Sequence, residues 1–121
     1  MPTFDTVRKL ADALAGVEEG TCYGTPALRV RGKLFARLRE DGDSLVLRTD
    51  PATRDLLLQA HPDVLYITDH YRDYPWILVR LSRVSRELLR MLIEDAWSRS
   101  APKSLRAPRA RPRSKKRSDS R

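Results

Sequence analysis

Residues 25–48 read Thr-Pro-Ala-Leu-Arg-Val-Arg-Gly-Lys-Leu-Phe-Ala-Arg-Leu-Arg-Glu-Asp-Gly-Asp-Ser-Leu-Val-Leu-Arg, and this stretch decides the fold. Apolar and basic residues alternate through it with a period of two, which is typical of strands that bury one face. Gly32 and Asp41-Gly42 are turn signals between the alternating runs. The stretch therefore predicts three consecutive antiparallel strands, with the core on one face and arginines around Phe35 on the other.

The turn at Gly32 conflicts with the alternation of the two strands beside it. A two-residue Gly32-Lys33 turn would place Arg31 opposite Leu34, although the pattern assigns Leu34 to the core face. A three-residue loop over residues 31–33, or a β-bulge, would remove the conflict. Burying an unpaired arginine would cost on the order of several kcal/mol. We therefore give the alternation precedence over the turn.

Helical patterns lie on both sides of these strands. Thr3, Asp50 and Ser85 are suitable N-caps, and a broad apolar stripe after Ser85 should cover the inner face of the sheet. The predicted helices cover residues 3–16, 50–61 and 85–100, and further strands are predicted over residues 17–23, 64–68 and 76–81. This order, with hairpin-like connections, predicts an α+β fold in which helices pack on one face of an antiparallel sheet.

Length and composition indicate one domain in a reducing compartment. The 121 residues suffice for a single modest core. The sequence contains no run of about 18 apolar residues, so no segment is expected to span a membrane, and the first residues lack the basic and apolar regions of a secretory signal. Cys22 is the single cysteine, so no disulfide framework forms within one chain. We expect a cytoplasmic protein without membrane contact.

The positive charge is concentrated at one end of the chain. The sequence has 24 basic and 16 acidic residues, a net charge of +8. Residues 101–121 hold nine basic residues and one acid, which leaves fifteen of each in residues 1–100. Prolines and serines separate the basic residues, and Leu105 is the one large apolar residue there. We predict a domain over residues 1–100 and a disordered basic tail over residues 101–121.

Six segments of the sequence carry a resemblance to a known family. The segments are residues 16–19 (Gly-Val-Glu-Glu), 23–27 (Tyr-Gly-Thr-Pro-Ala), 29–36 (Arg-Val-Arg-Gly-Lys-Leu-Phe-Ala), 70–76 (His-Tyr-Arg-Asp-Tyr-Pro-Trp), Ala96-Trp97 and 101–103 (Ala-Pro-Lys). They resemble the MmcQ/YjbR-like proteins of the CyaY-like fold and occur in family order over roughly residues 3–105. The resemblance implies a CyaY-like α+β fold and, from the usual description of the family, a DNA-binding protein with a double-wing arrangement. The basic tail beyond Leu105 is outside the shared region.

The first candidate site is the arginine-bearing face of the predicted sheet together with the tail. Arginine side chains can bind phosphates, and aromatic rings can stack on exposed bases. The alternative is a solvated face whose arginines pair with nearby acids, and a tail that only aids solubility or attracts an acidic protein. The predicted nucleic-acid-binding residues are Arg29, Arg31, Lys33, Phe35, Arg37, Arg39, Arg48 and Arg80, with Lys103, Arg106, Arg109, Arg111, Arg113, Lys115, Lys116 and Arg117 in the tail.

The second candidate site is an aromatic cluster that could line a small pocket beside the loop after Thr68. Its members are Tyr23, His70, Tyr71, Tyr74 and Trp76. The alternative, that these aromatics only hold the loop in place together with Pro75, is favoured. The sequence has no glycine-rich phosphate loop, nucleophile elbow or HExxH motif, and two separated histidines with one cysteine do not make a metal site.

These observations favour a DNA-binding protein that makes largely nonspecific phosphate contacts through the sheet face and the basic tail. The alternative is a protein-interaction or small-ligand-sensing domain that uses the aromatic loop around His70–Trp76. We expect no catalytic activity, no cofactor and no metal site. Nucleic acid, with DNA favoured, is the expected partner, and a protein partner is the alternative.

Overall fold

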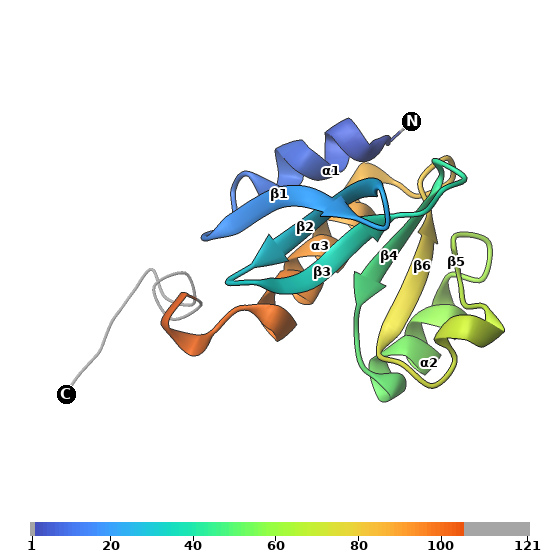
Figure 1. Cartoon of the computed structure of the whole chain (residues 1–121). Coiled ribbons are helices and arrows are strands. Elements are labelled where there is room, and N and C mark those ends of the chain that lie inside the picture. The colour runs from blue at the N-terminus through green and yellow to red at the C-terminus, as the bar shows by residue number, and fades with distance from the viewer. Residues whose placement is uncertain (1, 106–121) are drawn as a thin grey trace.

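A computed structural model describes residues 2–105 of the chain (Figure 1). Its elements are α1 (Phe4–Ala11), β1 (Val17–Cys22), β2 (Thr25–Val30), β3 (Lys33–Leu38), β4 (Ser44–Arg48), α2 (Pro51–Ala60), β5 (Leu65–Tyr66), the short 3₁₀ helix η1 (Asp69–Tyr71), β6 (Trp76–Arg80) and α3 (Arg86–Ser100). The strands form one antiparallel sheet in the order β1-β2-β3-β4-β6-β5. The predicted α+β fold with an antiparallel sheet is confirmed.

Two tight turns set the register of the first three strands. Tyr23 and Gly24 join β1 to β2 with φ angles of 54° and 81°, and Arg31 and Gly32 join β2 to β3 with φ angles of 52° and 83°. Two consecutive residues with positive φ define the type I′ hairpin turn, whose twist matches that of the strands it joins. The second turn therefore has two residues, but it lies one position earlier than the Gly32-Lys33 turn considered from the sequence.

A β-bulge at Phe35 corrects the predicted faces of β3. Leu28 pairs with Ala36 and Arg29 pairs with Leu34, so that Phe35 is an extra residue in β3. The bulge reverses the alternation. Phe35 was predicted among the arginines of the outer face, and this is wrong: its side chain is fully buried in the core. Leu34 takes the opposite position and faces outward.

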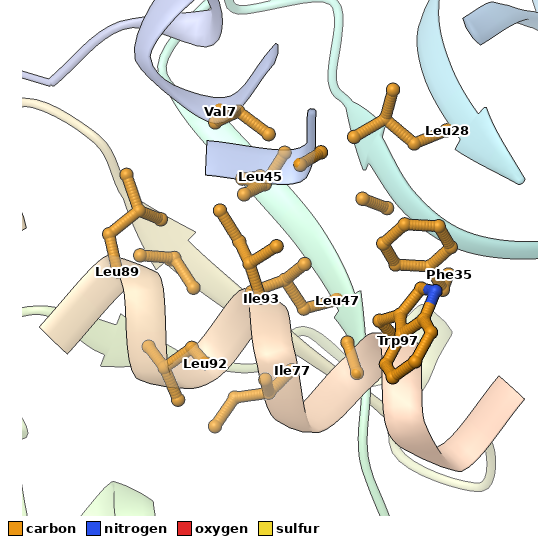
Figure 2. Packing of buried hydrophobic residues seen from close by; sticks show 14 of the residues in the cluster. Val7, Leu28, Phe35, Leu45, Leu47, Ile77, Leu89, Leu92, Ile93 and Trp97 are labelled. Atoms are coloured by element: carbon orange, nitrogen blue, oxygen red, sulfur yellow. The ribbon is translucent and has the colours of Figure 1, made fainter. Parts of the chain in front are cut away.

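The core lies between the sheet and the helices α1 and α3. α3 packs against β3, β4 and α1, and Figure 2 shows the Phe35 ring beside the Trp97 indole of α3. The Trp97 indole also donates a 2.9 Å hydrogen bond from Nε1 to the carbonyl oxygen of Ala15. The bulge thus moves a phenylalanine into the layer that α3 covers, where its burial stabilises the fold.

The packed part of the chain continues beyond the domain boundary predicted at residue 100. Ala101 is buried, and Leu105 packs against the core beside Gly16. The predicted disorder of the tail after Leu105 concerns residues outside the described range. Within residues 2–105, none of the helices combines the length and apolar character needed to cross a bilayer.

Candidate nucleic-acid interface

We call the sheet face opposite α1 and α3 the outer face. Residues that pair directly across strands project to the same side of a sheet. One such row crosses the middle of the outer face. It consists of Ala27, Arg37, Val46, Leu78 and Tyr66. Further outer-face pairs are Arg29 with Leu34, Arg48 with Trp76, and Ser44 with Arg80. Four strands therefore contribute predicted site residues to one surface.

Four arginines of this face form what we call the arginine set: Arg29, Arg39, Arg48 and Arg80. Arg39 directly follows β3 and continues its pairing, because its backbone N–H donates to the carbonyl oxygen of Ser44 at 2.8 Å. Among residues 2–105, no member of the set has a carboxylate oxygen within 4.0 Å. Glu18 is the cross-strand neighbour of Arg29 but forms no ion pair with it.

Aromatic rings hold two members of the arginine set. The guanidinium carbon of Arg80 lies 4.1 Å from the centre of the Tyr66 ring, and that of Arg48 lies 5.1 Å from the centre of the Trp76 ring. Both distances are within the range of cation–π attraction. Such contacts restrict the side chains without neutralising their charge. These two guanidinium groups are therefore already ordered and remain positively charged.

Arg37 differs from the arginine set because it is buried, with 7% of its surface exposed. Nη2 donates to the Glu40 carboxylate at 2.8 Å, and Nε donates to the Cys22 carbonyl oxygen at 3.3 Å. Nη1 contacts the Tyr71 hydroxyl at 3.4 Å, and the guanidinium lies over the Tyr23 ring. Arg37 was predicted to be an open phosphate contact, but it is buried and forms part of the wall of a pocket.

Three further predicted nucleic-acid-binding residues within the described range lie outside the arginine set. Arg31 and Lys33 are exposed at the β2–β3 turn, and Lys103 is exposed after α3. The tail residues lie outside the described range. They are Arg106, Arg109, Arg111, Arg113, Lys115, Lys116 and Arg117.

The five residues of the predicted aromatic cluster line one pocket on the outer face. The pocket has a volume of about 330 Å³. Its lining residues are Cys22, Tyr23, Leu34, Arg37, Val46, His70, Tyr71, Tyr74 and Trp76. The sheet supplies one wall, and the segment between β5 and β6 supplies the other. Tyr23 and Tyr74 are strongly exposed, so their rings are accessible to a ligand.

Arg54 holds the second wall of the pocket in place. It is the one residue of α2 that is buried. Its Nη1 donates to the carbonyl oxygens of Tyr71 (3.2 Å), Tyr74 (2.7 Å) and Trp76 (3.2 Å), and its Nη2 donates to that of Arg72 (2.8 Å). Nothing in the sequence marks Arg54 as different from a surface arginine, because its acceptors are backbone atoms 17 to 22 residues later.

The carboxylate of Asp41 lies in the turn between β3 and β4 and is influenced by one member of the arginine set, Arg39. Burial raises the pKa of Asp41. Hydrogen bonds from the backbone N–H groups of Asp43 and Ser44 and from the Ser44 hydroxyl lower it, and so does the charge of Arg39. Together these effects hold the pKa below its usual range. Asp41 is therefore ionised and held in the turn. Residues 2–105 contain no cluster of His, Cys, Asp or Glu suited to a metal ion.

Comparisons with known proteins identify the family. The family model described as YjbR matches residues 12–99. The crystal structure of Deinococcus radiodurans protein DR2400, with the domain DUF419, is similar with a TM-score of 0.72 and 26% identity, over 93% of this chain and 91% of that one.

Two mycobacterial relatives are similar over a shorter stretch. The uncharacterized proteins Rv2570 of Mycobacterium tuberculosis and Mb2600 of Mycobacterium bovis are each 37% identical over 65 residues, which is 53% of this chain. The match spans about half the length of these curated relatives. Because the family model covers most of the chain, the chain belongs to the MmcQ/YjbR family.

Proposed function

We propose that the protein binds nucleic acid, DNA in the first instance, mainly through nonspecific contacts with phosphates. The observation that carries this proposal is the arginine set, because four guanidinium groups share one face without a carboxylate partner in the described part of the chain. A planar guanidinium presents paired N–H donors that fit phosphate oxygens. The proposal assigns a binding role and no catalytic step.

The near-neutral charge of residues 1–100 is compatible with this proposal, since its distribution is uneven. Many of the acids pair with arginines away from the outer face. Arg8 of α1 pairs with Asp5 and Glu19, and Arg90 of α3 pairs with Glu87 and Glu94. These pairs remove positive charge from the helical side. The arginine set keeps its charge, which supports attraction of polyanions to the outer face.

The start of the basic tail supports the same proposal. A Cβ at Gly16 would lie 2.8 Å from Cδ1 of Leu105 and 3.9 Å from Nε of Arg31. Leu105 therefore lies beside the β2–β3 turn, which carries Arg31 and Lys33. We propose that the basic residues that follow Leu105 in the sequence tether the polyanion electrostatically.

The proposal is tested by the salt dependence of binding to a duplex oligonucleotide, measured by fluorescence anisotropy. Each phosphate neutralised in a DNA duplex contributes about −0.9 to the slope of log K against log salt. The double variant Arg48→Gln/Arg80→Gln should therefore reduce the slope by about 2. The control Lys9→Gln/Arg90→Gln removes the same charge from α1 and α3 and should change it much less. Absence of binding at low salt, or equal slopes for the two variants, would contradict the proposal.

The pocket favours a second candidate function, which is recognition of a small ligand or a protein through the segment from His70 to Trp76. Aromatic walls with a buried guanidinium are typical of small-molecule sites. Recovery of a stable protein partner from nuclease-treated extract, lost in Tyr74→Ala, would favour this function over nucleic-acid binding.

A further inference from the structure

We propose that the outer-face pocket accepts one unstacked nucleobase, so that the protein binds single-stranded nucleic acid in preference to duplex. This inference rests on the proposed function and adds the class of nucleic acid. The arginine set would contact the phosphates, while the pocket holds a base of the same strand. A paired and stacked base within a duplex cannot enter such a pocket without being turned out of the helix.

The size and lining of the pocket fit a nucleobase. Its volume of about 330 Å³ lies at the lower end of the range for small-molecule sites. Tyr71 and Tyr74 line it from the segment between β5 and β6, Trp76 lines it from β6, and Tyr23 lines it from the β1–β2 turn. Every base has a flat π-face, and single-strand-binding proteins commonly stack such faces on aromatic side chains. The walls therefore offer a stacking surface for any base.

Arg37 supplies polar recognition inside the pocket. A guanidinium carries five N–H bonds. Among the described residues, three of its bonds are directed at the Cys22 carbonyl oxygen, the Tyr71 hydroxyl and the Glu40 carboxylate. Two N–H bonds remain for the keto oxygen of a base. Because Glu40 and Tyr71 fix the guanidinium, a ligand would meet an oriented donor.

Arg48 links the pocket to the arginine set, of which it is a member. Trp76 lines the pocket, and the guanidinium of Arg48 lies over the same indole ring. A base in contact with Trp76 would therefore place its own phosphate near a cation that lacks a carboxylate partner in residues 2–105. One strand could then use both sites at once.

The test compares binding of the full chain to an oligo-dT strand and to a hairpin duplex with the same number of phosphates, at one salt concentration. We expect the strand to bind about tenfold more tightly than the duplex. Tyr74→Ala should weaken binding of the strand by about tenfold, a loss within the range for one stacked base, and should leave duplex binding nearly unchanged. Met91→Ala, an exposed site on α3, is the control.

A second variant guards against misfolding. Tyr23 has a φ of 54°, and asparagine is favoured at this position of a type I′ turn. Tyr23→Asn should therefore fold well, and it should still weaken binding of the strand.

Equal affinity for strand and duplex, unaffected by either tyrosine variant, would overturn the base pocket but leave phosphate binding intact. If free thymidine monophosphate bound as tightly as the oligo-dT strand, the proposal that the pocket recognises a base within a strand would be overturned. Failure of both nucleic acids to bind at low salt would instead remove the proposed function.

Discussion

The buried guanidinium of Arg54 donates a 2.7 Å hydrogen bond to the backbone carbonyl oxygen of Tyr74. The same side chain bonds three further carbonyl oxygens of the segment that precedes and begins β6. α2 is otherwise exposed or half-buried along its length. This helix therefore acts on the outer face through one side chain, which fixes the aromatic wall of the pocket.

Replacement of Arg54 should destabilise the protein and loosen the pocket together. Arg54→Met keeps the length of the side chain but leaves four carbonyl oxygens without their charged donor. The free energy of unfolding should fall by roughly 2–4 kcal/mol, the contribution of one or two charge-assisted hydrogen bonds. Urea denaturation measures the change. Arg83→Met, at an exposed site, should stay within about 0.5 kcal/mol of the original chain; equal effects would show that Arg54 is not a structural donor.

The β-bulge predicts a large difference between two adjacent residues of β3. Phe35→Ala should lower the free energy of unfolding by roughly 3–5 kcal/mol, because it leaves a cavity against α3. Leu34→Ala, on the half-buried outer side, should cost only about 1 kcal/mol. Chemical denaturation of both variants measures the contrast. A larger loss of stability in Leu34→Ala than in Phe35→Ala would contradict the bulge and favour an uninterrupted alternation in β3.

The fold was predictable because the turn residues and the alternation are local signals. A glycine occupies the second position of both hairpin turns, and the apolar period separates strands from helices. The sequence pattern assigned Phe35 to the wrong face of the sheet. The position of the β-bulge depends on which side chain packs beside Trp97, and such packing is a property of the tertiary structure. The five residues of the predicted aromatic cluster line one pocket, yet the part played by Arg54 depends on backbone acceptors, which leave no trace in the sequence.

The β2–β3 turn offers a stabilising substitution. Arg31 has a φ of 52°, a conformation that costs most residues about 1–2 kcal/mol and that asparagine tolerates better. Arg31→Asn should therefore raise the free energy of unfolding by about 0.5–1 kcal/mol. Lys33→Asn, in the strand that follows, should give no such gain. Thermal unfolding of the two variants compares them, and a loss of stability in Arg31→Asn would contradict the turn geometry.

The stability of the protein should fall in acid partly through Asp50, the N-cap of α2. A 2.8 Å hydrogen bond from the Thr53 backbone N–H lowers its pKa; burial opposes this effect, while the Thr53 hydroxyl and the Arg99 guanidinium add to it. Since the folded pKa lies below the unfolded value of about 3.9, the ionised carboxylate stabilises the folded state above that pH. This contribution is lost as the pH falls through the folded pKa.

The comparison with Asp50→Asn isolates this effect. Asparagine caps a helix about as well as aspartate but does not titrate. The stability advantage of the original chain over Asp50→Asn should therefore shrink as the pH is lowered from 6 towards the folded pKa. Urea denaturation across this range measures the advantage, and a difference that is independent of pH would exclude the charge of Asp50 as its cause.

The two tryptophans provide the most direct measurement of where nucleic acid binds, because they lie on opposite sides of the sheet. Trp76 lines the outer-face pocket, and Trp97 of α3 is buried on the helical side of the sheet with its indole N–H bonded to the carbonyl oxygen of Ala15. In a ¹⁵N–¹H correlation spectrum of the full chain, added oligonucleotide should shift the Trp76 indole signal and leave that of Trp97 in place. Shifts confined to backbone signals beyond residue 105, with the Trp76 indole unmoved, would contradict binding by the outer face.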